Sequence, residues 1–467
     1  MTVPDDRALV LFEPQRDTIY NFDALQLLRL LPDESVHCCV TSPPYFGLRD
    51  YGADGQIGLE PTPDEYVAAL VAVFREIRRV LRSDGTVWLN LGDSYASATK
   101  GSDGLSDKQL SNAGSRYQPR KFNHDVKPKN LIGIPWRVAF ALQADGYYLR
   151  SDIIWSKDNP MPESVTDRPT RAHEYVFLLT KSPRYWYDQM AIAEPCVSGD
   201  RGSTYTNGKT AEKATHLASI GRGPRTDKQA ATGKRTYEGF NERWDENPTT
   251  TRNKRSVWTI NPEPFPAAHF ATMPTKLVET CLLAGCPPKV CAACGAPYKR
   301  VMSEERELDM SRPQARRALE LFRDKGLNDG HLDAIRAVGL ADAGKALVVM
   351  DGAGKNTDEM QRLADEAKAA LGGYYREFTY GKRSSIGWQP TCACNAGVDS
   401  GIVLDPFMGA GTVAFVAQKL NRHWIGSDLN PEYVELATMR VQGRLDEYMA
   451  RQRGEAHTQY MFAEAAS

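Results

Sequence analysis

The sequence has almost no net charge and no long run of apolar residues. Its 58 Lys and Arg residues nearly balance 59 Asp and Glu residues, so any surface that attracts nucleic acid must be local. No apolar stretch is long enough to span a bilayer, and the first residues do not form a charged-then-apolar signal sequence. These absences predict a cytoplasmic protein, in which the nine cysteines are thiols or metal ligands rather than disulfides.

Alternating strand and helix patterns indicate an α/β core within a chain whose 467 residues are enough for two or three units. The helix should begin near Pro63 and be closed by Asp84-Gly85, and the unpatterned residues 95–130 should form a mobile loop. Strands are expected at 35–40, 85–91, 148–154 and 175–179, with a helix at 62–82. This order predicts a mainly parallel sheet with helices on its faces.

One predicted strand ends in the unusual sequence Thr41-Ser42-Pro43-Pro44-Tyr45. Proline has no amide hydrogen, fixes its own φ and restricts the residue before it. Pro43 and Pro44 therefore stiffen a loop that presents hydroxyl and carbonyl oxygens beside the ring of Tyr45. Such a loop suits a flat ligand that offers an amino group.

A second informative stretch, residues 401–430, reads as half of a nucleotide-binding α/β unit. Glycines allow the backbone to approach a ligand closely, and an acidic residue about twenty positions further on can take ribose hydroxyls. The expected parts are a strand at 402–404, a glycine-rich turn at 405–411, a helix at 412–420 and a strand at 424–426 that leads to Asp428.

Together, Thr41-Ser42-Pro43-Pro44-Tyr45 and Asp405-Pro406-Phe407-Met408-Gly409-Ala410-Gly411 resemble the amino-methylating DNA methyltransferases, which use S-adenosylmethionine. The catalytic motif precedes the cofactor motif, and this order resembles the permuted beta class. Residues 269–286 are similar to the helix before the cofactor loop in that class. The resemblance covers most of 17–188 and 258–440 and implies a Rossmann-like methyltransferase core.

In the resembled family, the Ser42 hydroxyl and the Pro43 carbonyl would accept hydrogen bonds from an exocyclic amine, and Tyr45 would stack on the base. The amine is inaccessible inside a duplex, so the nucleotide must be flipped out. A serine before Pro-Pro-Tyr favours cytosine N4, with adenine N6 as the alternative. Methylation at carbon 5 would need a cysteine nucleophile, and Cys196 lies outside the motif.

The resemblance also implies a cofactor site. Asp405, Phe407, Gly409 and Gly411 should line the methionine part, and the helix that starts at Thr412 could hold the carboxylate. Asp428 should take the ribose hydroxyls, and Asp23 matches the acidic position near the adenine amino group, although Phe22 replaces the usual glycine.

Trp155 and Lys157 match a family segment beside the target-base pocket. An equally good interpretation is that Trp155 is simply a buried residue at the end of a strand.

Residues 191–257 are expected to form the target-recognition region. Residues 201–255 contain twelve Lys or Arg residues and six Asp or Glu residues. The tract could be a solvated linker, but basic residues interleaved with aromatic ones can grip a phosphate backbone and stack on bases. The aromatic residues are Tyr205, Tyr237, Phe240 and Trp244.

Two close cysteine pairs, Cys291 with Cys294 and Cys392 with Cys394, favour a structural zinc site with four thiolate ligands over incidental thiols, which are the alternative. Between the pairs, three amphipathic helices are expected at 311–324, 328–338 and 357–371.

The domain expectation is a catalytic half at 1–190, a cofactor half at 258–290 and 395–445, a clasped helical insertion at 291–394 and a tail at 446–467.

The predicted function is methyl transfer from S-adenosylmethionine to cytosine N4 in a specific sequence of double-stranded DNA. A zinc-containing DNA-binding protein with an inactive methyltransferase core, and a methyltransferase that acts on RNA or protein, are the rivals. The sequence leaves a cognate restriction endonuclease and a homodimer open as partners.

Overall fold

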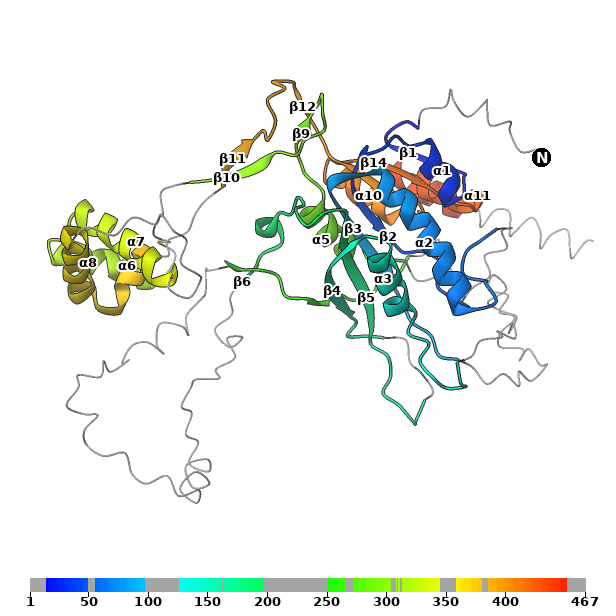
Figure 1. The fold of residues 1–467 in the computed structure, drawn as a ribbon, viewed down its shortest axis with the longest axis horizontal. Helices are drawn as coiled ribbons and strands as arrows, with labels where there is room; N and C mark the ends of the chain where they lie inside the picture. Colours follow the sequence, from blue (N-terminus) through cyan, green and yellow to red (C-terminus); the bar gives the residue numbers. More distant parts are fainter. Residues whose placement is uncertain are drawn as a thin grey trace, which may run out of the picture. The chain divides into compact units, whose positions relative to one another are not determined.

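The chain folds into two compact units, one of Met1–Ile192, Arg255–Lys299 and Trp388–Ser467, the other of Ala193–Lys254 and Arg300–Gly387 (Figure 1). The structure is a computed structural model. It describes residues 14–48, 55–96, 126–160, 163, 165–195, 251–265, 272–303, 308, 310, 313–344, 358–379 and 385–451.

An eight-stranded sheet in the order β1-β14-β13-β2-β3-β5-β4-β8 forms the centre of the first unit. Its strands are β1 (Thr18–Tyr20), β2 (Val36–Thr41), β3 (Leu81–Leu91), β4 (Tyr148–Ser156), β5 (His173–Thr180), β8 (Val257–Thr259), β13 (Ile402–Asp405) and β14 (His423–Ser427). β5 runs antiparallel to its neighbours β3 and β4, and the other pairings in this sheet are parallel. The mainly parallel sheet expected from the sequence is therefore present.

Helices cover both faces of the sheet, because alternate strand residues point to opposite sides. In β2, Cys39 belongs to the core under α1 (Ala24–Leu30), α2 (Pro63–Val80) and α3 (Ile134–Ala144). Its neighbour Cys38 belongs to the core under α5 (Thr275–Gly285), α10 (Thr412–Lys419) and α11 (Pro431–Val441). β2 is buried along its whole length, as a strand covered on both faces should be.

The start of α2 was predicted correctly, but its end was not. Thr62 and Glu65 form a capping box and Pro63 occupies the first turn. The helix ends at Val80, and β3 begins directly at Leu81. Gly85 lies inside β3, where a Cβ would meet the Leu81 side chain at 2.7 Å, so this glycine permits close packing rather than closing the helix.

The second unit contains the three helices expected between the cysteine pairs, and its core includes Ala318, Ile335, Leu371 and Phe378. They are α6 (Pro313–Asp324), α7 (Asp329–Gly344) and α8 (Asp358–Leu371), followed by a 3-10 turn (Gly372–Tyr374) and the short α9 (Tyr375–Thr379). Another short 3-10 turn, Gln189–Ile192, belongs to the first unit.

Three two-stranded sheets complete the described structure. β6 (Glu194–Pro195) pairs with β7 (Thr251–Arg252), β9 (Val290–Cys291) with β12 (Val398–Asp399), and β10 (Lys299–Met302) with β11 (Ser385–Gln389). In the part of the chain that the structure describes, no helix combines the length and the apolar character of a membrane span.

Candidate active site

The two sequence motifs follow the carboxyl ends of two neighbouring strands of the central sheet, β2 and β13. β2 and β13 are parallel neighbours, with Cys38 opposite Val403 and Cys39 opposite Leu404. Their carboxyl ends therefore lie side by side, where open α/β sheets bind their ligands. The loop that begins at Ser42 follows one strand, and the glycine-rich turn after Asp405 follows the other.

The loop after β2 is held from two sides. The Tyr66 hydroxyl donates to the Pro44 carbonyl at 2.8 Å, and Pro43 is buried. A Cβ on Gly92, at the end of β3, would lie 2.5 Å from Tyr45 Cε2, so only a glycine lets the tyrosine ring pack there. The stiff loop expected from the two prolines is thus also fixed by its surroundings.

A polar network surrounds the Tyr45 hydroxyl, which donates to Glu174 Oε2 at 2.6 Å. Asn90 Nδ2 donates to the Tyr45 hydroxyl at 2.8 Å and to Glu174 Oε2 at 3.0 Å. Ser42 Oγ lies 3.4 Å from both the Tyr45 hydroxyl and Asn90 Nδ2. Burial raises the pKa of Tyr45 well above its usual value, and the Glu174 charge adds to this rise. The phenol therefore stays protonated and acts as a hydrogen-bond donor to Glu174.

Trp155 and Lys157 lie beside this network. Lys157 Nζ forms an ion pair with Glu174 Oε1 and stands 4.3 Å from the centre of the Trp155 ring. The indole is only 3% exposed and donates to the Ile260 carbonyl at 2.7 Å. Trp155 therefore packs in the core between β4 and β8, while Lys157 reaches the network.

Sequence reasoning missed Asn90 and Glu174. Both are polar residues inside otherwise apolar strands, in the sequences "VWLNLG" and "HEYVFLL". A buried polar residue needs a partner, so each was a signal for a site. The partner could not be identified from the sequence, because the pairing of β3 with β5 brings residues 84 positions apart together.

In the second motif, Asp405 is 1% exposed and receives hydrogen bonds through one carboxylate oxygen only. Oδ1 accepts from the Thr41 hydroxyl at 2.7 Å and from the Phe407 amide at 3.1 Å. Oδ2 is buried without a hydrogen-bond partner among the described residues. Burial raises the pKa of Asp405 to about 7, against the effect of its two hydrogen bonds.

The glycines of this turn have different roles. Gly409 has a φ of 51° and open space beside it, and its amide donates to Asp428 Oδ2 at 2.8 Å. Gly411 has a φ of 73°, and a Cβ there would meet the Ala437 Cβ at 2.7 Å. Gly411 therefore lets α10 pack against α11, whereas a Cβ on Gly409 would have no atom nearer than the Phe407 carbonyl oxygen at 4.0 Å.

Each Asp428 oxygen already accepts one backbone hydrogen bond, because Oδ1 receives the Asn430 amide at 2.9 Å. Burial raises the pKa of this carboxyl as well. Thr412 Oγ1 accepts from Arg440 Nη1 at 2.9 Å, so its hydroxyl is engaged within the protein. α10 has no side-chain cap, which leaves the amides of its first turn available.

Asp23 lies close to this edge, three residues after β1. It is the N-cap of α1, where its Oδ1 accepts from the Gln26 amide at 2.9 Å. Phe22 stacks on Tyr20 with ring centroids 5.6 Å apart. Asn21, next to it, donates to the Asp428 carbonyl at 3.1 Å, so β1 and β14 are tied together at the expected cofactor edge.

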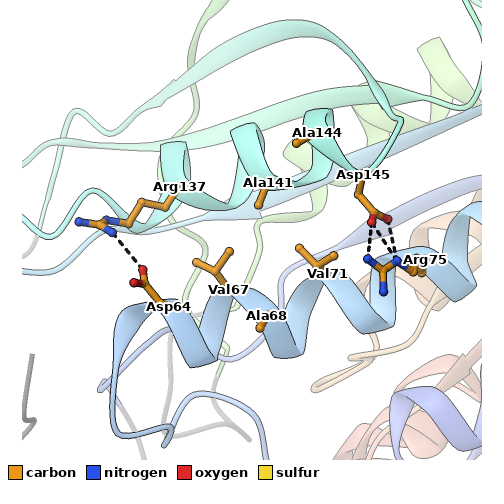
Figure 2. Close-up of a pocket in the computed structure, with 9 residues that line it drawn as sticks. All are labelled: Asp64, Val67, Ala68, Val71, Arg75, Arg137, Ala141, Ala144 and Asp145. Atoms are coloured by element: carbon orange, nitrogen blue, oxygen red, sulfur yellow. Dashed lines mark hydrogen bonds and ion pairs between the residues drawn. The ribbon is translucent and has the colours of Figure 1, made fainter.

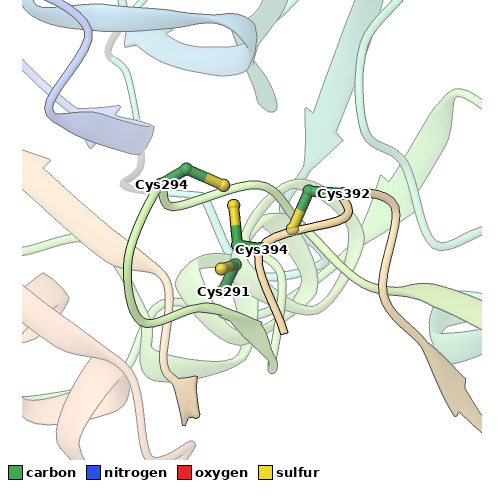
Figure 3. A group of neighbouring side chains, drawn as sticks. All are labelled: Cys291, Cys294, Cys392 and Cys394. Atoms are coloured by element: carbon green, nitrogen blue, oxygen red, sulfur yellow. The ribbon is translucent and has the colours of Figure 1, made fainter. Parts of the chain in front are cut away.

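Near the amino ends of β2 and β13, the two cysteine pairs come together (Figure 3). The sulfur atoms of Cys291, Cys294, Cys392 and Cys394 all lie within 4.8 Å of one another, and all four are free thiols. A tetrahedral zinc ion with Zn–S bonds of about 2.3 Å requires sulfur atoms about 3.8 Å apart. The donor set and its dimensions therefore fit a four-thiolate metal.

The turn that carries the first cysteine pair is attached to the sheet by His37. Ile402 donates its amide to His37 Nδ1 at 3.0 Å, so Nε2 carries the proton and donates to the Gly295 carbonyl at 2.9 Å. Burial lowers the pKa of His37 to about 4, which keeps the imidazole neutral.

A groove of about 690 Å³ lies between α2 and α3, away from the network and the glycine-rich turn. Figure 2 shows that small apolar side chains line it and that an ion pair closes it at each end, Arg137 with Asp64 and Arg75 with Asp145. It contains none of the predicted site residues.

Several expectations fall outside the described residues. These are Cys196, most of the loop 95–130, most of the recognition region 191–257, and the tail after Arg451.

The comparisons with known proteins agree with the geometry. A family model of N6/N4 DNA methylases matches residues 36–290 and 394–439. The chain is 34% identical to type II methyltransferase M.Cfr9I of Citrobacter freundii over 91% of this chain and 88% of that protein. It is 43% identical to type II methyltransferase M.SmaI of Serratia marcescens over 57% of this chain and 74% of that protein.

Among solved structures, the chain is similar to PvuII DNA methyltransferase (cytosine-N4-specific), at 14% identity and a TM-score of 0.42 over 92% of this chain and 87% of that one. That likeness is weak, and the sequence matches decide the family. The chain belongs to the N6/N4 DNA methylase family and is a DNA methyltransferase.

Proposed function

We propose that the chain methylates the exocyclic N4 of a flipped-out cytosine within a specific DNA sequence. The observation that carries this proposal is the hydrogen bond between Thr41 and Asp405, which holds the Ser42 loop beside the glycine-rich turn. A base at the first loop and a methyl donor at the second would be neighbours. Much of the rate enhancement then comes from proximity.

The residues of the loop after β2 are assigned to make the target amine a better nucleophile. The lone pair of a nucleobase amine is delocalised into the ring, so the nitrogen is a poor nucleophile. The Ser42 hydroxyl and the Pro43 carbonyl are assigned as acceptors for its hydrogens, which localises the lone pair, and the Tyr45 ring is assigned to stack on the base. Pro44, fixed through its carbonyl, holds these groups in place.

The residues around the glycine-rich turn fit S-adenosylmethionine. The buried Asp405 Oδ2, which has no hydrogen-bond partner among the described residues, is assigned to accept from the ammonium of the methionine part, and Phe407 and Gly409 are assigned to line the same part. The first turn of α10 would hold the carboxylate, Asp428 the ribose hydroxyls and Asp23 the adenine amine. The bound donor supplies an electrophilic methyl: an N–C bond forms, the electron pair of the broken S–C bond stays on sulfur, and an amine proton leaves to water.

Ser42 is also the basis for choosing cytosine N4 over adenine N6, which remains the alternative target in the same fold. We further propose that residues 191–257 read the DNA sequence and that methylation protects the site from a cognate restriction endonuclease.

We also propose that the four cysteines bind zinc. Zinc would tie Cys291 and Cys294 to Cys392 and Cys394 across a chain segment of about one hundred residues. Its role would be structural, because four thiolates leave no open coordination position.

Mass spectrometry of nucleosides tests the target base. DNA incubated with the protein and labelled S-adenosylmethionine should contain labelled N4-methylcytosine, and sequencing should map the site. Ser42→Ala should lose activity by about 10² or more while the cofactor affinity stays nearly constant. Ser35→Ala, at the other end of the same strand, is the matched control. Label on N6-methyladenine would overturn the choice of base but keep the active site.

A further inference from the structure

One buried atom of the polar network has no partner. Asn90 is 3% exposed, and its Nδ2 is within hydrogen-bond distance of the Tyr45 hydroxyl, Glu174 Oε2 and, at 3.4 Å, Ser42 Oγ. Its Oδ1 has no hydrogen-bond partner among the described residues. Because a buried amide oxygen without a donor is unfavourable, this atom is suited to receive an N–H group from a ligand.

Glu174 decides which way the Asn90 amide faces. A carboxylate only accepts hydrogen bonds, so the amide nitrogen must face Glu174 and the amide oxygen must point away from it. A flipped Asn90 would place two oxygens against each other. The second Glu174 oxygen is satisfied by Lys157, and the first also receives the Tyr45 hydroxyl.

We propose that Asn90 Oδ1 accepts a hydrogen of the target amine beside Ser42, and that Glu174 is the positioning residue that holds Asn90 and Tyr45 for this task. The inference rests on the proposed function, because it requires the amine to lie at Ser42. Asn90 Oδ1 would share one amine hydrogen with the Ser42 hydroxyl, while the Pro43 carbonyl accepts the other. Asn90 becomes a catalytic residue of the chain, and Glu174 acts through it.

An exchange of chemical groups separates this role from a purely structural one. Asn90→Asp keeps an acceptor at this position but places two carboxylates side by side. Adding Glu174→Gln restores a donor between them, since the glutamine amide can donate to the introduced carboxylate. We expect N90D to lower the single-turnover rate on DNA carrying the mapped site by about 10². The double variant N90D/E174Q should recover about tenfold or more of this loss.

A second measurement tests the contact with the amine itself. Wild-type protein should bind 2-pyrimidinone, which is cytosine without its amino group, about tenfold more weakly than cytosine when each base lies opposite an abasic site, so that neither has a pair to break. Asn90→Leu should lose most of this difference. Cofactor affinity, measured by calorimetry, should stay within about threefold of wild type for every variant. Glu34→Gln is the control, because it removes an ion pair with Lys181 at the other end of the sheet.

The outcomes are distinguishable. A wild-type protein that binds S-adenosylmethionine but methylates no DNA would overturn the proposed function and this inference together. Active wild-type protein with N90D/E174Q no faster than N90D, or with N90L discriminating against 2-pyrimidinone as strongly as wild type, would overturn only this inference.

Discussion

The Thr41 hydroxyl donates a 2.7 Å hydrogen bond to Asp405 Oδ1, between two residues 364 positions apart in the sequence. Each residue is the last of its strand, β2 or β13, and each is followed by one of the two functional loops. Under the proposed function, this one buried side-chain contact sets the distance between the base side and the cofactor side of the active site.

Removing this hydroxyl should affect both stability and cofactor binding. Thr41→Val keeps the shape of the side chain but leaves Asp405 Oδ1 with the Phe407 amide as its remaining donor, which should cost about 1–3 kcal/mol of unfolding free energy. Urea denaturation measures this loss, and calorimetry should show weaker binding of S-adenosylmethionine. Thr280→Val is the control, because Thr280 is buried in α5 and its hydroxyl bonds only the Lys276 carbonyl of its own helix. Equal cofactor affinities in the two variants would contradict a link between Thr41 and the cofactor.

Cofactor binding should release a proton at mildly acidic pH. Burial raises the pKa of Asp405 from 3.8 to about 7, so the folded protein binds this proton more tightly than the unfolded chain. Its contribution to stability is present below about pH 3.8 and is lost as the pH rises to about 7. A cationic ammonium beside Oδ2 favours the charged carboxylate and expels the proton.

Calorimetry at pH 6 in buffers of different ionisation enthalpy would detect that proton. Asp405→Asn should abolish the buffer dependence and flatten the change of stability between pH 4 and 7. A wild-type binding enthalpy that is the same in all buffers would contradict the assignment of Asp405 to the ammonium.

Gly411→Ala should destabilise the first unit by about 1–3 kcal/mol, because the new Cβ would collide with Ala437 and strain a positive φ. Gly443→Ala has a similar φ of 72° but nothing within 4 Å, so it measures the backbone cost alone. The difference between the two variants in thermal denaturation gives the cost of separating α10 from α11. Equal losses would mean that the helices move apart freely.

Zinc removal should loosen the first unit without touching the loop after β2. We expect about one zinc per chain in protein prepared without chelator, and a lower melting temperature after chelation. Cys294→Ser should reproduce the loss, and Ala293→Ser, an exposed change in the same turn, should not. Protein that contains no metal and melts at the same temperature with and without chelator would refute the clasp.

The sequence predicted those parts of the site that are continuous in the chain. The roles proposed for Ser42 to Tyr45 and for Asp405 to Asp428 rest on short motifs, and these roles stay predictions until they are tested. Glu174 and Asn90 were missed because their roles arise only from the antiparallel pairing of β5 with β3, which no local pattern specifies. The end of α2 was predicted wrongly for a similar reason, because Gly85 is explained by its close packing against the Leu81 side chain and not by the end of the helix.

A metal bound by the four cysteines would fix the second of the two places where the chain leaves the first unit and returns to it. Cys291 and Cys294 stand just before one crossing, Cys392 and Cys394 just after the other, and His37 attaches the first pair to the sheet. With such a metal in place, residues 300–387 would be able to lengthen, shorten or be exchanged while β13 still starts from the same place. If the metal is confirmed, this position would be a tolerant site for evolution, and for engineers who wish to append a new module to the enzyme.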